Sequence, residues 1–140
     1  MIGDPLVTHP GWPSWGALIA RIVIAVVFAI AAYFKFADMG STALFIGAAG
    51  FPMALALAWI AAIFEVLLVL AFLSGVAFRQ AALLALIYVL FLAFTFHGPS
   101  HWKDNQMEFG FFVDHFTFAA GLLYMLAFGP GPLMLGRAKI

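Results

Sequence analysis

Four long apolar segments dominate the pattern of hydrophobic and polar positions along the chain. They cover residues 15–34, 53–74, 80–97 and 109–128, and stretches containing glycine, proline or charged residues separate them. A transmembrane helix needs about 20 mostly apolar residues, which each segment supplies to within a few residues. The pattern therefore predicts an all-α integral membrane protein, an antiparallel four-helix bundle that forms a single domain over residues 1–140.

Each predicted helix carries one stripe of polar or small residues at steps of three and four. An ionisable side chain in lipid costs about 3 kcal/mol, so it is expected to face the bundle interior and find a partner. Arg21 and Lys35 share one face of the first helix, and Glu65 continues a seam of alanines in the second. Because Arg21 and Glu65 lie at similar depths in their segments, we expect an Arg21–Glu65 ion pair with a structural role.

A second polar level is predicted near the opposite end of the bundle, next to the loop that carries His101 and Glu108. The side chains at this level or on the polar stripes are Lys35, Tyr88, His97, Asp114, His115 and Tyr124. We take Asp114, His115 and His97 as candidate proton-exchanging, catalytic residues, and Lys35, Tyr88 and Tyr124 as candidate cofactor contacts. A purely structural role is the alternative for each of them. Asp114 and His115 lie about 100° apart around one helix, so both cannot point to the centre of the bundle.

The polar loop also contains a spacing that can hold a metal ion. His97 and His101 are four residues apart, which places two imidazoles on one face of a continuous helix. Gly98 and Pro99 intervene, and proline disfavours helical backbone at the preceding residue. The four-residue spacing therefore no longer predicts that the two imidazoles share one face of a helix. The sequence favours a solvated connector over a metal site, and we predict no metal.

Composition narrows the possible functions. Hydrophobic residues make up 66% of the chain and charged residues 9%, and six basic side chains balance six acidic ones. This composition places the chain in a lipid bilayer and gives no basic surface for nucleic acid. Cysteine is absent, which removes thiol chemistry and thiolate metal sites. A redox role would therefore need a bound cofactor or a partner subunit.

The distribution of lysine and arginine predicts the orientation in the membrane. Arg79, Arg137 and Lys139 lie on the side of the termini, and Lys35 and Lys103 lie on the other side. This small excess favours cytoplasmic termini in a bacterial-type inner membrane. The first 15 residues contain Asp4 and no lysine or arginine, so we expect no secretory signal there.

The chain resembles the DoxX family of small four-helix membrane proteins over nearly all of residues 18–135. The resemblance rests on an arginine early in the first segment followed by "AAYFKFAD", on the closing "GPGPL", and on the central block "GAAGFPMALALAWIAAIFEVLLVLAFLSGVAFRQAALL". Within that block, Glu65, Gly75 and Arg79 fit the family's pattern. One departure occurs at "FFVDH", where Asp114 and His115 stand in place of the lysine and asparagine that members often carry.

The resemblance implies a membrane subunit associated with a quinone-linked respiratory or thiosulfate-type oxidoreductase. The 17 phenylalanines could form an apolar slot for a quinone headgroup between the helices. The alternative is an accessory subunit, without chemistry of its own, that packs against other membrane subunits or further copies of itself. A small transporter is a third hypothesis, although four short helices leave little room for a pore.

Overall fold

The computed structural model describes residues 11–134, and every regular element in this range is a helix. The elements are α1 (Trp12–Ala37), α2 (Met39–Ala48), α3 (Ala54–Ser74), α4 (Phe78–His97), the short 3-10 helix η1 (Pro99–His101) and α5 (Gln106–Phe128). By length and composition, α1, α3, α4 with η1, and α5 are each able to cross a membrane. The predicted all-α fold class is confirmed, and the four long helices begin and end within about three residues of the predicted segments.

Two expectations concern residues outside the described range of 11–134. The expected absence of a secretory signal concerns residues 1–15, of which residues 1–10 lie outside the described range. Arg137 and Lys139, which contribute to the lysine and arginine count, follow residue 134.

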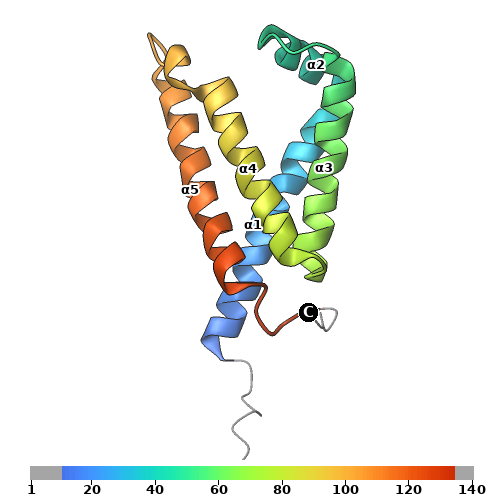
Figure 1. Ribbon diagram of the computed structural model, residues 1–140, viewed down its shortest axis with the longest axis vertical. Helices are drawn as coiled ribbons and strands as arrows, with labels where there is room; N and C mark the ends of the chain where they lie inside the picture. Colours follow the sequence, from blue (N-terminus) through green and yellow to red (C-terminus); the bar gives the residue numbers. More distant parts are fainter. Residues whose placement is uncertain (1–10, 135–140) are drawn as a thin grey trace, which may run out of the picture.

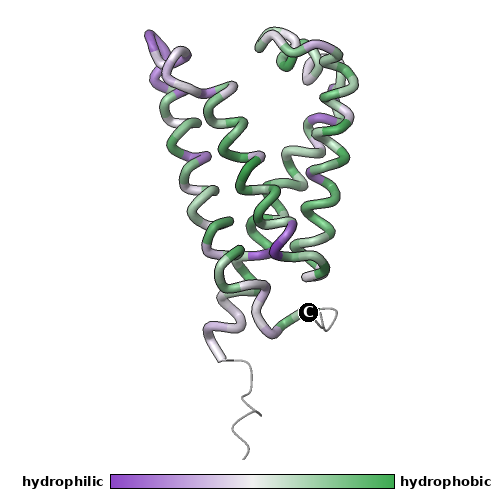
Figure 2. The backbone as a smooth tube through the Cα atoms, in the orientation of Figure 1, coloured by the Kyte–Doolittle hydropathy of each residue, from purple (hydrophilic) through white to green (hydrophobic). Residues whose placement is uncertain are grey.

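The long helices form two pairs (Figure 1). α1 packs along α3, and α4 packs along α5. The pairs meet at the lower end of the view, where a short turn joins α3 to α4, and they diverge toward the upper end, where α2 and η1 lie. Figure 2 shows hydrophobic positions along the length of every long helix, with hydrophilic positions gathered in the loop between η1 and α5 and near the lower turn.

Small side chains allow α1 and α3 to approach closely. Ala32 of α1 and Ala58 and Ala62 of α3 are at most 3% exposed, and Phe28 lies opposite Phe72 with 6.0 Å between their ring centroids. The predicted inner face of the first helix, marked by Arg21 and Lys35, is confirmed: Arg21 is buried and Lys35 is partly buried. Ala25, Phe28 and Ala32, which lie between them on the same face, are also buried. Helical spacing therefore predicted the inner face of α1 correctly.

The inner face of α5 differs from the predicted one. Its buried residues are Ala119, Leu122 and Met125, whereas Asp114 and Tyr124 are exposed. The prediction assumed that the polar residues of this helix face the bundle interior. In α5 the apolar residues occupy every side, and the face that fits against α4 is the one that carries the small and flexible side chains.

α2 was not among the helices predicted from the sequence. Asp38 begins this helix: its Oδ1 accepts a hydrogen bond from the Ser41 backbone N–H at 2.9 Å, and its Oδ2 accepts one from the Ser41 hydroxyl at 2.7 Å. These two hydrogen bonds lower the pKa of Asp38 below its ordinary value. An N-cap aspartate before an apolar run that ends in glycine was the available signal.

Candidate functional site

A buried carboxylate joins the two helix pairs. Glu65 of α3 is 1% exposed and accepts hydrogen bonds from side chains of two other helices. Lys35 Nζ of α1 donates to Glu65 Oε1 at 2.8 Å and to Oε2 at 2.9 Å, and Tyr88 Oη of α4 donates to Oε1 at 2.8 Å. The ion pair and the phenol together satisfy a charge that would otherwise be costly to bury.

The predicted Arg21–Glu65 ion pair is wrong, because Lys35 occupies that position. The contact of Phe28 with Phe72 fixes the relative positions of α1 and α3. Seven residues further along α1 and seven back along α3, about two helical turns, the same register brings Lys35 to Glu65. Arg21 lies toward the other end of α1, where its Nη1 donates to the Pro130 carbonyl oxygen at 3.0 Å.

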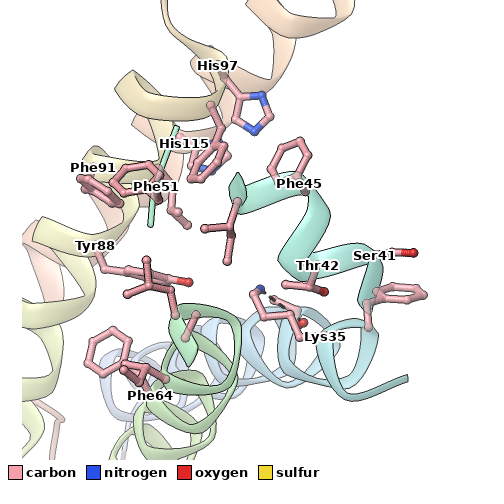
Figure 3. A pocket seen from close by; sticks show the side chains of 18 residues that line it. Lys35, Ser41, Thr42, Phe45, Phe51, Phe64, Tyr88, Phe91, His97 and His115 are labelled. Carbon is pink, nitrogen blue, oxygen red and sulfur yellow. Dashed lines mark hydrogen bonds between the residues drawn. The ribbon is translucent and has the colours of Figure 1, made fainter. Parts of the chain in front are cut away.

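A cavity of about 690 Å³ opens above this cluster, between the diverging pairs (Figure 3). Its aromatic lining consists of Phe34, Phe45, Phe51, Phe64, Phe91 and Phe96. Its polar lining consists of Lys35, Ser41, Thr42, Tyr88, His97 and His115. Figure 3 shows the Tyr88 hydroxyl and the Lys35 ammonium group on the floor, pointing toward one another, and the two histidines at the upper edge. The cavity is therefore mostly apolar, with polar groups at its two ends.

A second, smaller cavity of about 370 Å³ lies on the α1 and α5 side. It shares Lys35, Tyr88 and His115 with the larger cavity, and its lining also includes Glu65 and Asp114. Lys35 and Tyr88 of the Lys35–Glu65–Tyr88 cluster thus line both cavities, and Glu65 lines the smaller one.

Two imidazoles lie next to each other at the edge of the large cavity, with 5.0 Å between the ring centroids of His97 and His115. Each ring is oriented by a hydrogen bond at Nδ1. His97 Nδ1 lies 2.6 Å from Glu108 Oε2, and His115 Nδ1 lies 2.7 Å from the Phe111 carbonyl oxygen. The Trp102 indole N–H donates to the His97 carbonyl oxygen at 2.7 Å and orients the end of α4.

The structure brings four of the six candidate residues to one cavity: Lys35, Tyr88, His97 and His115 all line it. Asp114 lines only the smaller cavity and is exposed. Tyr124 lines neither cavity, and its ring packs on Phe128 with 4.4 Å between centroids. Tyr124 was selected because it lies on the polar stripe of the fourth segment, and that stripe faces outward.

Two residues of the site have roles that differ from the ones expected from the sequence. Glu65 was assigned to a structural pair with Arg21, yet it is the acceptor shared by Lys35 and Tyr88. Glu108 was placed in the solvated loop, yet it lies in the first turn of α5 and contacts His97. The connection between His97 and Glu108 includes η1 and turns the chain back so that the two side chains meet. The spacing of 11 residues along the sequence does not predict this turn.

His101 does not join His97 in a metal site, because α4 ends at His97 and His101 belongs to the separate helix η1 that follows the extended residue Gly98. Its Nδ1 lies 3.2 Å from the Ser100 hydroxyl, and the side chain is exposed. Within residues 11–134, no group of three or more His, Cys, Asp or Glu side chains is placed to hold a metal ion.

This arrangement suits a flat apolar molecule with polar substituents at its edge. The volume lies in the range of small-molecule sites, and such sites combine an apolar lining with a few oriented polar groups. The imidazole and carboxylate groups at the rim are of the kinds that act as proton donors and acceptors in proteins.

Comparison with known proteins places the chain in a family of membrane proteins. The model of the DoxX family matches residues 16–98, more than half of the 140-residue chain. The matched range contains α2, α3, α4 and all but the first four residues of α1. It ends one residue after His97, so Glu108 and His115 of α5 lie beyond it. No curated protein and no solved structure matches the sequence. The predicted resemblance is confirmed by the family match, and the chain belongs to the DoxX family.

Proposed function

We propose that this DoxX-family protein is the quinone-binding membrane subunit of an oxidoreductase. The observation that carries the proposal is the cavity of about 690 Å³ with aromatic walls. Its floor is formed by Lys35 and Tyr88, both of which donate hydrogen bonds to the buried Glu65 carboxylate. A ring with an isoprenoid tail is a lipid-soluble ligand of suitable shape for a cavity of this size.

The proposal includes the arrangement of the chain in the membrane. The four long apolar helices cross the bilayer as an antiparallel bundle, and the ten-residue α2 is too short to cross it. The termini lie in the cytoplasm of a bacterial-type inner membrane, as the excess of lysine and arginine on that side favours. The upper edge of the cavity, with His97 and Glu108, then faces the outer aqueous layer.

The residues at the cavity fit a quinone. The phenylalanine rings offer stacking surfaces for the headgroup, and the imidazoles and Tyr88 offer polar contacts at its edge. A bound quinone supplies two-electron redox chemistry, which a chain without cysteine lacks. Within the chain, Lys35 and Glu65 hold the floor rigid, and His97 with Glu108 provides proton-exchanging groups at the rim. A partner subunit supplies or removes the electrons.

Ligand binding to the purified protein in detergent micelles or nanodiscs tests this function. We expect saturable binding of decylubiquinone or of its reduced form at one molecule per chain, measured by equilibrium dialysis. Ala61→Trp fills the cavity without altering a charged residue and is expected to abolish binding. Ile63→Trp on the same helix is the matched control, because Ile63 is 50% exposed and lines neither cavity.

A second control concerns Tyr124, the candidate cofactor contact that lies outside both cavities. Tyr124→Phe is expected to leave ligand binding unchanged, because Tyr124 lies outside both cavities. If neither redox form binds, and the protein copurifies with larger subunits at a fixed ratio, the function is that of an accessory subunit and the proposal is wrong.

A further inference from the structure

The side chains that line the large cavity offer unused hydrogen-bond acceptors but no unused donors. Every side-chain donor that lines it already donates to an acceptor within the protein. The Lys35 ammonium group donates to both oxygens of Glu65, and its third proton faces the Ala31 carbonyl oxygen at 3.5 Å. The Tyr88 hydroxyl donates to Glu65.

The two hydroxyl groups contributed by α2 are used in the same way. Ser41 Oγ donates to Asp38 Oδ2 at 2.7 Å, and Thr42 Oγ1 donates to the Asp38 carbonyl oxygen at 3.1 Å. The residues that cap α2 therefore also remove these hydroxyl protons from the cavity.

The imidazoles complete the pattern, because their partners determine their tautomers. A carbonyl oxygen accepts only, so His115 Nδ1 must donate to Phe111 O, and the neutral ring then carries its lone pair on Nε2. An ionised carboxylate also accepts only, so the His97 Nδ1 proton points to Glu108. Both rings line the cavity at its upper edge (Figure 3), and in the neutral form of each ring Nε2 carries no proton.

The hydrogen-bonding sites that remain unused on these side chains are therefore acceptors. They are Nε2 of His97, Nε2 of His115, and the oxygen lone pairs of Tyr88, Ser41 and Thr42. An acceptor wall discriminates between ligands by the protons that they carry: a carbonyl oxygen finds no donor in it, whereas a hydroxyl group finds a partner.

The geometry points to selectivity for the reduced ligand: the cavity binds a hydroquinone in preference to the corresponding quinone. One hydroxyl group of the ring donates to the imidazole pair at the upper edge, and the other donates to the Tyr88 oxygen at the floor. The quinone has only acceptor oxygens, and both are desolvated against acceptors. This inference rests on the proposed function and assigns the redox form that the site holds.

Matched ligands test the inference on the unmodified protein. Affinities of decylubiquinol, decylubiquinone and the dimethyl ether of decylubiquinol are measured by anaerobic equilibrium dialysis, at a pH well above the ordinary imidazole range. A neutral hydrogen bond contributes about 1 kcal/mol, or about fivefold in affinity, so two hydroxyl groups predict a preference of about thirtyfold for the hydroquinone over the quinone. The dimethyl ether keeps the ring but lacks the protons, and is expected to bind as weakly as the quinone.

The outcomes separate the two proposals. A quinone that binds as tightly as the hydroquinone, or an ether that does, overturns the inference and leaves the proposed function standing. Failure of all three ligands to bind overturns both. Because these measurements need no variant, they do not depend on whether a substituted protein folds.

A pair of variants then locates the discriminating group. His115→Phe removes one acceptor and keeps an aromatic ring, so the preference for the hydroquinone is expected to fall about fivefold while affinity for the quinone changes little. His101→Phe is the matched control, because His101 is exposed and does not line the cavity. An unchanged preference in His115→Phe removes His115 from the discriminating role.

Discussion

Loss of the Lys35 ammonium group leaves the Glu65 carboxylate buried with Tyr88 as its one remaining side-chain partner. Glu65 is 1% exposed, and a methionine at position 35 has no N–H group to replace the two hydrogen bonds that Lys35 donates. Removal of one member of a buried ion pair costs about 3–5 kcal/mol. We therefore expect Lys35→Met to lower the free energy of unfolding by about that amount.

The double variant Lys35→Met with Glu65→Leu is expected to be much less destabilised than the sum of the two single variants. It removes both charges and fills the space with apolar groups, which is often close to neutral for a buried pair. We expect a coupling energy between the two positions of about 2–4 kcal/mol. Arg21 provides the contrast, because it contacts Pro130 and not Glu65. The losses caused by Arg21→Met and Glu65→Leu are expected to add within about 0.5 kcal/mol.

Both cycles are measured by reversible unfolding in mixed micelles as the mole fraction of denaturing detergent increases, followed by circular dichroism. Additive losses at Lys35 and Glu65 would refute the assigned ion pair. A large coupling between Arg21 and Glu65 would show instead that the register of α1 against α3 differs from the one described.

Two further predictions concern the first turn of α2 and the connecting segments that contain Gly50 and Gly131. The hydrogen bonds that lower the pKa of Asp38 are expected to protect the first turn of α2 fully above the ordinary carboxyl pKa of 3.8, and this protection is lost as the pH falls through the lowered pKa. Amide exchange at Ser41 measures the protection. Asp38→Asn, which caps the helix without titrating, should abolish this pH dependence. Gly131→Ala is expected to cost about 2–3 kcal/mol, because a positive φ of 78° disfavours alanine and the new Cβ would lie 2.9 Å from Ala17 Cβ. Gly50→Ala, also at a positive φ but with open space around it, should cost only about 1 kcal/mol, and equal losses in the same unfolding assay would contradict the described packing of residue 131 on α1.

The helices themselves were predictable from the sequence. A run of about 20 apolar residues has few ways to satisfy its backbone N–H and C=O groups in lipid, and a helix satisfies them within the segment. The inner face of α1 was predictable for a related reason, because Arg21 and Lys35 mark it on an otherwise apolar surface. α5 offered two polar faces, and the choice between Asp114 and His115 depended on which side packed against α4.

Sequence alone therefore determined the all-helical class, the four long segments, the family and the inner face of α1. The tertiary structure decided that Lys35, and not Arg21, reaches Glu65, that His97 meets His115 and Glu108, and that Tyr124 lies away from the site. The physical reason is that helical periodicity fixes the direction of a side chain around its own axis but not its height against a neighbouring helix. That height depends on the packing of large and small side chains between helices, such as Phe28 against Phe72. A shift of about four turns along α1, the distance from Arg21 to Lys35, would exchange one cation for the other.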